Sequence, residues 1–134
     1  VQIGGPLGGF IPADKLGETR LCFDDLAKAG AMMGDAITVL DQNTSIIESL
    51  NYFIKFLKGE SCGKCFSCKE TLRRTNEILE DMLENKGHKG DIELLEKLAN
   101  YTKDTSLCQL GKSMYNPIHT AVKHFRKEFE ERTK

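Results

Sequence analysis

Residues 45–59 read Ser-Ile-Ile-Glu-Ser-Leu-Asn-Tyr-Phe-Ile-Lys-Phe-Leu-Lys-Gly, and their apolar side chains recur at the spacing of one helix face. Ser45, followed three residues later by Glu48, forms a capping box that starts a helix. Gly59 is expected to end it. The apolar face consists of Ile46, Ile47, Leu50, Phe53, Ile54 and Leu57. This stretch predicts an amphipathic helix that buries one side.

Three later segments show the same helical period. Ser67 and Glu70 form a second capping box, whose helix is expected to stop near residues 86–87. Asp91 is expected to cap a third helix, and Asn116-Pro117 to start a fourth. The residues expected to face inward are Leu72, Leu79, Met82 and Leu83, then Ile92, Leu94, Leu95, Leu98 and Tyr101, then Ile118, Ala121, Val122, Phe125 and Phe129. The fold class is therefore mainly α, with a four-helix bundle.

Residues 1–44 are expected to form a small partial α+β segment ahead of the bundle. The run Gly4-Gly5-Pro6-Leu7-Gly8-Gly9 is expected to turn, to lie close to another backbone or to be loose. It is a poor phosphate loop, because it lacks a GxGxxG frame and a Gly-Lys-Ser/Thr ending. A short helix is expected over residues 19–29 and a strand over residues 36–40. That strand needs a partner, either the N-terminal segment or strands outside these residues.

Composition excludes several classes of protein. The chain has 134 residues, with 19 Lys and Arg against 20 Asp and Glu, so a basic nucleic-acid-binding surface is not expected. Apolar residues make up 40% and charged residues 29%, as in proteins that bury a core. Apolar runs are too short for membrane insertion, and no secretory leader opens the chain. Because it begins with Val1, we expect a piece of a longer cytoplasmic protein.

The five cysteines have an informative spacing. Cys62, Cys65 and Cys68 are separated by two residues each, Cys108 follows 40 residues after Cys68, and Cys22 stands apart. An odd number of cysteines in a chain without a leader favours metal or redox chemistry over disulfides. Two-residue gaps allow one loop to bind three corners of a cluster, and a helix N-terminus next to the loop favours thiolates. Cys108 is the best-placed candidate for a fourth ligand.

Other interpretations of the cysteines remain open at this point. Structural zinc also takes four thiolates, but its usual frame is two Cys-x2-Cys pairs. The bacterial ferredoxin run would continue to Cys-Pro, and Leu72-Arg73 stands there instead. Spacing therefore favours an iron–sulfur cluster over a zinc-stabilised structural or interaction domain, and both over inert buried thiols. Cys22 is expected to be a small buried side chain, and Phe66 an apolar lid over the cysteine loop.

Several segments together resemble a known family. They are Glu60-Ser61-Cys62-Gly63-Lys64-Cys65-x-x-Cys68-Lys69-Glu70, Ser106-Leu107-Cys108-Gln109-Leu110-Gly111, Asn116-Pro117 and His124-Phe125-Arg126-x-Glu128-Phe129. The chain is similar to the C-terminal part of the NADH- and FMN-binding flavoprotein subunit of respiratory complex I. Related subunits occur in NAD(P)-linked and electron-bifurcating iron hydrogenases, and the segments Leu107-Cys108-Gln109-Leu110-Gly111 and Asn116-Pro117 look closer to that hydrogenase branch.

The resemblance implies two parts and one cofactor. Residues 1–44 look like the end of the β-grasp (soluble-ligand-binding) domain, with a departure at Asp35-Ala36, and residues 45–134 like the iron–sulfur-binding helical domain. The four cysteines Cys62, Cys65, Cys68 and Cys108 would hold one [4Fe-4S] cluster that accepts electrons from FMN. FMN and NAD(P)H would bind a domain that precedes this segment, so these residues alone are expected to be inactive and to hold no catalytic residue. The expected partners are other iron–sulfur subunits of a complex I-like or hydrogenase assembly.

Overall fold

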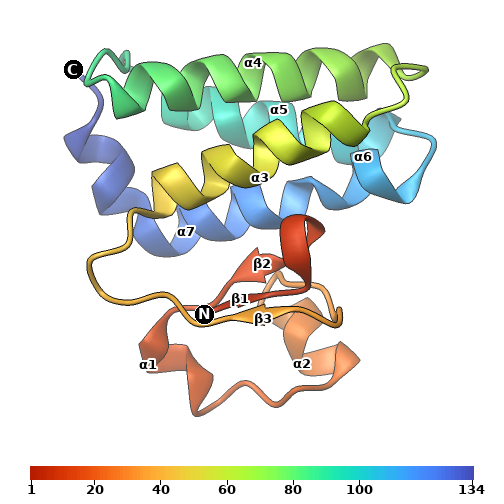
Figure 1. The fold of residues 1–134 in the computed structure, drawn as a ribbon, viewed down its shortest axis with the longest axis vertical. Coiled ribbons are helices and arrows are strands. Elements are labelled where there is room, and N and C mark those ends of the chain that lie inside the picture. Colours follow the sequence, from red (N-terminus) through yellow and green to blue (C-terminus); the bar gives the residue numbers. More distant parts are fainter.

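The computed structural model describes all residues, 1–134, and its larger part is a bundle of four long helices (Figure 1). These helices are α3 (Ile46–Glu60), α4 (Phe66–Leu83), α5 (Asp91–Thr105) and α7 (Tyr115–Glu131). The four-helix prediction is confirmed. A short helix, α6 (Gln109–Ser113), lies in the link between α5 and α7 and was not anticipated from the sequence. No helix is both long enough and apolar enough to cross a membrane.

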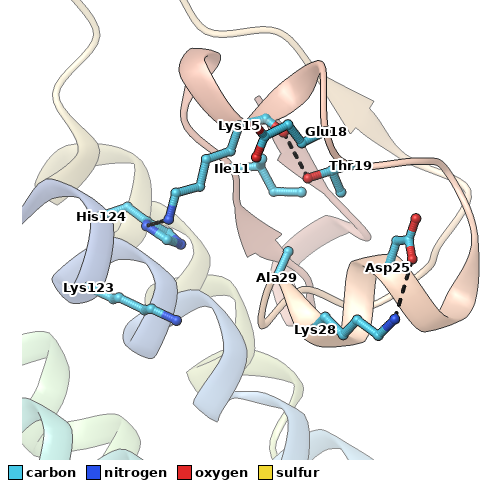
Figure 2. Close-up of a pocket in the computed structure, with 9 residues that line it drawn as sticks. All are labelled: Ile11, Lys15, Glu18, Thr19, Asp25, Lys28, Ala29, Lys123 and His124. Atoms are coloured by element: carbon cyan, nitrogen blue, oxygen red, sulfur yellow. Dashed lines mark hydrogen bonds and ion pairs between the residues drawn. The ribbon is translucent and has the colours of Figure 1, made fainter.

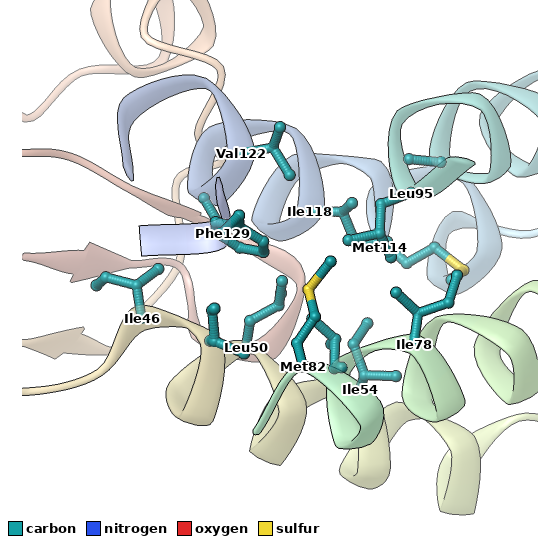
Figure 3. Close-up of a cluster of buried hydrophobic side chains, with 14 of the residues drawn as sticks. Ile46, Leu50, Ile54, Ile78, Met82, Leu95, Met114, Ile118, Val122 and Phe129 are labelled. Carbon is teal, nitrogen blue, oxygen red and sulfur yellow. The ribbon is translucent and has the colours of Figure 1, made fainter. Parts of the chain in front are cut away.

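All four long helices contribute to one apolar core (Figure 3). Leu50, Leu79, Leu95 and Ile118, one from each helix, are all fully buried. Tyr101 was expected to face inward and is instead 55% exposed. The inward stripe of α5 passes through Ile92, Leu95, Ala99 and Thr102, which leaves Tyr101 on the outer side.

The start of α3 is capped from two directions. The Ser45 hydroxyl accepts a hydrogen bond from the Glu48 N–H at 3.1 Å, as the capping box predicts. It also donates to Glu128 Oε1 of α7 at 2.7 Å. The carboxylate of Glu128 accepts from the backbone N–H groups of Ile46 and Ile47 at 3.1 and 3.3 Å. The free N–H groups of α3 are thus bound by the last long helix of the bundle.

Other helix boundaries also differ from the predictions, and α4 ends at Leu83 instead of near residues 86–87. Cys65 takes the N-cap position of α4, so Ser67 lies inside the helix and does not cap it. Gly90, with φ +96°, takes the N-cap position of α5, and Asp91 is the first helical residue. The Asp91 carboxylate instead accepts from the His88 N–H at 2.7 Å. α3 continues through Gly59 and ends at Glu60.

The start of α7 also differs from its prediction. Met114 takes the N-cap position, so Asn116-Pro117 lies in the first turn and does not cap the helix. The Asn116 side chain donates instead to the Leu7 carbonyl at 3.0 Å, which ties α7 to the N-terminal segment.

The first 44 residues form a small sheet with short helices beside the bundle (Figure 1). Its strands are β1 (Gln2–Ile3), β2 (Gly9–Phe10) and β3 (Ile37–Thr38), in the antiparallel order β2-β1-β3. The strand predicted over residues 36–40 therefore does pair with the N-terminal segment. The short helices are η1 (Gly5–Leu7), α1 (Ala13–Leu16) and α2 (Phe23–Lys28).

The glycine-rich run brings backbone segments close together and joins this small sheet to α7. A Cβ at Gly8 would overlap the Ile3 carbonyl, which explains the need for glycine at that point. The Phe10 N–H donates to the buried Thr120 Oγ1 of α7 at 2.9 Å, and the Phe10 ring belongs to the bundle core. A separate cluster of Ile3, Ile11, Leu26 and Ala31 fills the N-terminal part.

Candidate metal centre

Two links of the bundle meet at one end, beside α6 (Figure 1). One link, residues 61–65, joins α3 to α4, and the other, residues 106–108, joins α5 to α6. A cavity of about 120 Å³ lies between them. It is lined by Glu60, Ser61 and Leu110 and by four thiols, which belong to Cys62, Cys65, Cys68 and Cys108. The structure therefore brings together all four cysteines that the sequence singled out, although Cys108 is 40 residues away from Cys68.

The fifth cysteine lies elsewhere. Cys22 takes the N-cap position of α2 in the N-terminal part and does not line this cavity. It is half-buried rather than fully buried, so the prediction of a small core side chain holds only in part.

The four thiols differ in exposure. Cys68 stands in the first turn of α4 and is 5% exposed, whereas Cys62 and Cys108 are exposed and Cys65 is intermediate. Gly63, with φ +72°, makes the turn that separates Cys62 from Cys65. The cavity thus has a dry side formed by α4 and a side that water reaches.

The ionisation of two thiols is shifted in opposite directions. Burial raises the pKa of the Cys68 thiol above its usual value, and the neighbouring thiols add to this, while a hydrogen bond with Ser61 opposes it. The backbone amides of Gly111 and Leu110 lower the pKa of the Cys108 thiol. Cys108 takes the N-cap position of α6, where free N–H groups favour negative charge.

Close packing surrounds Gly111 of α6 next to the thiols, where α6 follows the C-cap residue of α5, Ser106. Gly111 of α6 is buried, and a Cβ added there would overlap the Ser106 hydroxyl and lie 3.5 Å from Cys68 Cβ. The Ser106 side chain is 4% exposed, and its hydroxyl has no hydrogen-bond partner. Sequence reasoning included Ser106 and Gly111 in the family motif but assigned them no packing role, because their contact depends on how the link between α5 and α6 folds.

Two kinds of metal group take four thiolates, and they differ in how far apart the sulfurs stand. All four thiols line the same cavity, yet no three His, Cys, Asp or Glu side chains are arranged to hold one metal ion. A single zinc ion requires its sulfurs at about 2.3 Å from one point. An iron–sulfur cubane binds each thiolate at a separate iron, so its ligands stand farther apart.

Phe66 does not form the expected lid. It is the first residue of α4, does not line the cavity, and is 77% exposed. Leu110 of α6 lines the cavity instead. Beside the loop, Leu107 is 85% exposed, and the cations Lys64 and Lys69 are exposed as well.

A second cavity lies between the N-terminal part and α7 (Figure 2). Figure 2 shows Lys15 of α1 reaching toward His124 of α7, with Lys15 Nζ at 3.5 Å from His124 Nδ1. The rim of this second cavity is formed by exposed side chains such as Lys28 and Glu18. It contains no thiol, so the cysteine cavity is the better candidate for a functional site.

Comparison with known proteins identifies the family. Residues 48–132 match the NADH-ubiquinone oxidoreductase-F iron-sulfur binding region. The chain belongs to this family. It is 35% identical to the HndC subunit of the NADP-reducing hydrogenase of Solidesulfovibrio fructosivorans, over 97% of this chain and 26% of that protein. It is 37% identical to a subunit of the NADH-quinone oxidoreductase of Rhizobium meliloti (strain 1021), over 94% of this chain and 30% of that protein.

These relatives confirm the resemblance seen in the motifs, without favouring either branch. The chain spans between a quarter and a third of their length. Solved structures of an NAD+-reducing [NiFe]-hydrogenase share the fold. The air-oxidized form gives a TM-score of 0.86 at 25% identity, covering 99% of this chain and 23% of that one. The H2-reduced form gives a TM-score of 0.80 at 24% identity, over 99% of this chain and 22% of that one.

Proposed function

We propose that this member of the iron–sulfur-binding family is an electron-transfer module that holds one [4Fe-4S] cluster. The proposed ligands are Cys62, Cys65, Cys68 and Cys108. The observation that carries this proposal is that these thiols, from two links distant in sequence, line one cavity. When bound, the cluster would take up and release one electron at a time.

The residues of the chain would have distinct tasks in binding the cluster. Cys68 and Leu110 would keep water from the inner side of the cluster, because Cys68 is buried and Leu110 lines the cavity. The amides at the start of α6 would stabilise the Cys108 thiolate. Since the two links belong to different helix pairs, the cluster would join both pairs at that end.

We further propose that electrons reach this site from FMN, and that FMN and NAD(P)H bind outside these 134 residues. The names of the relatives refer to NADP and NADH, and no glycine-rich nucleotide fingerprint occurs in this sequence. The small sheet and its own apolar cluster support residues 1–44 as the end of a β-grasp domain, with residues 45–134 as the cluster-binding part. The proposed partners are the other iron–sulfur subunits of a complex I-like or hydrogenase assembly, in the cytoplasm.

Anaerobic reconstitution with ferrous iron and sulfide tests this proposal against the zinc alternative. We expect a brown protein with about four iron and four sulfide per chain, which becomes paramagnetic when dithionite reduces it. The same protein is offered zinc in a parallel sample. A colourless protein that binds no iron and takes up one zinc per chain would overturn the proposal.

A further inference from the structure

Ser61 is the hydroxyl side chain that contacts a thiol of the cavity. It follows the last residue of α3 as the C-cap, with extended backbone angles of −68° and 126°. Its Oγ lies 3.6 Å from Cys68 Sγ, within hydrogen-bonding distance for sulfur, and Ser61 lines the cavity. Because the preceding turn of α3 packs in the core through Leu57, which is 2% exposed, the position of Ser61 is set by the bundle.

Resting on the proposed function, we propose that Ser61 is a positioning residue that raises the reduction potential of the cluster. Its hydroxyl would donate a hydrogen bond to the Cys68 thiolate. Reduction adds one electron to the cluster and breaks no bond of the protein, so the sulfurs become more negative. A hydrogen bond to a charged acceptor is stronger than one to a neutral acceptor, and it therefore stabilises the reduced state more than the oxidised state.

The burial of Cys68 makes Ser61 matter more than a donor elsewhere at the site. Cys62 and Cys108 are exposed, so water can donate to their sulfurs when a protein donor is lost. Cys68 is 5% exposed, and water has little access to its sulfur. The loss of the Ser61 hydroxyl would therefore remain uncompensated at this ligand.

The test compares reconstituted wild-type protein with Ser61→Ala, and with the pair Ser61→Thr and Ser61→Val. Threonine and valine have nearly the same shape, and only threonine carries a hydroxyl. A redox titration followed by electron paramagnetic resonance should give a more negative midpoint potential for Ser61→Ala and Ser61→Val, at unchanged iron content. Ser61→Thr should keep the wild-type potential. Ser67→Ala is the control in the same segment, because Ser67 has no hydrogen bond to a thiol.

The outcomes separate this inference from the proposed function. Absence of iron from the wild-type protein would refute the proposed function itself. Equal potentials in wild type, Ser61→Ala and Ser61→Val, all loaded with iron, would overturn the role of Ser61 and leave the proposed function intact. Loss of iron from the alanine and valine variants, with retention in Ser61→Thr, would also overturn it, because the hydroxyl would then serve cluster retention.

Discussion

Cys108 is the residue on which the proposed ligand set depends most, because it comes from a different link than the other three. A cubane bound by three thiolates exposes one iron, so Cys108→Ser should lower the iron content after reconstitution. It should also reduce the stabilisation that iron gives to the fold, since metal binding and folding are coupled when the site forms only in the folded state. Iron analysis and thermal unfolding of the loaded protein measure both effects.

Cys22→Ser is the matched control for that substitution, because Cys22 lies at the start of α2, away from the cavity. It should leave iron content and spectrum unchanged. If Cys22→Ser lost the cluster while Cys108→Ser retained it, the fourth ligand would have been assigned to the wrong residue.

Gly111 is a second residue whose substitution has a definite expected effect, because Ser106 at the end of α5 leaves no room for a side chain there. A methyl group there would overlap the Ser106 hydroxyl, so Gly111→Ala should destabilise the protein by about 1–3 kcal/mol through overpacking. Urea unfolding without metal measures this directly. In the control Gly59→Ala, the new methyl lies in open space on α3, and a gain of about 0.5–1 kcal/mol is expected. Equal stability of Gly111→Ala and wild type would show that Ser106 and α6 can shift apart without cost.

At the scale of elements, the contact between α7 and the start of α3 has the clearest consequence. Glu128 accepts from two backbone N–H groups of α3 and from the Ser45 hydroxyl. Glu128→Ala removes the carboxylate that these N–H groups bind. The free energy of unfolding, measured with urea, should therefore fall by about 1–2 kcal/mol.

Glu48→Ala is the control, because the capping box predicted from the sequence uses the Glu48 side chain to cap α3. Glu48 donates its backbone N–H to Ser45, and an alanine retains that group. Its effect should therefore be a few tenths of a kcal/mol, mainly from the helix dipole. A larger loss in Glu48→Ala than in Glu128→Ala would mean that α3 is capped locally rather than by α7.

At the scale of the whole molecule, the sequence predicts what depends on local pattern and misses what depends on contact between distant segments. The apolar period and the cysteine spacing predicted the four long helices and the four thiols of the cavity. The cap from Glu128 on α3 and the hydrogen bond from Asn116 to the Leu7 carbonyl form only when segments distant in the chain meet. The prediction that Ser67 caps α4 was wrong, because Cys65, with extended backbone angles, takes that position and the helix begins two residues earlier.

The junction between the N-terminal part and the bundle gives the molecule a dependence on pH. Burial lowers the pKa of the His124 imidazole, as do Lys15 of α1 and the neighbouring Lys123 and His119, against a hydrogen bond with the Ala29 carbonyl. Burial also lowers the pKa of His119, which stacks on Tyr115 with ring centres 4.8 Å apart. Lys123 and Lys103 add to this shift, and Glu96 opposes it.

Acidification should therefore destabilise the folded chain. In the unfolded chain a histidine takes up its proton at about pH 6.5. In the folded state His119 and His124 do so only at lower pH. Just below about pH 6.5 the unfolded state binds more protons, so the free energy of unfolding falls as pH falls from about 7.5 to about 5.5. Urea unfolding at both values measures this decrease, and His119→Gln with His124→Gln should make it smaller. If the double variant showed the same decrease as wild type, the pH dependence would come from other titratable groups and not from these two imidazoles.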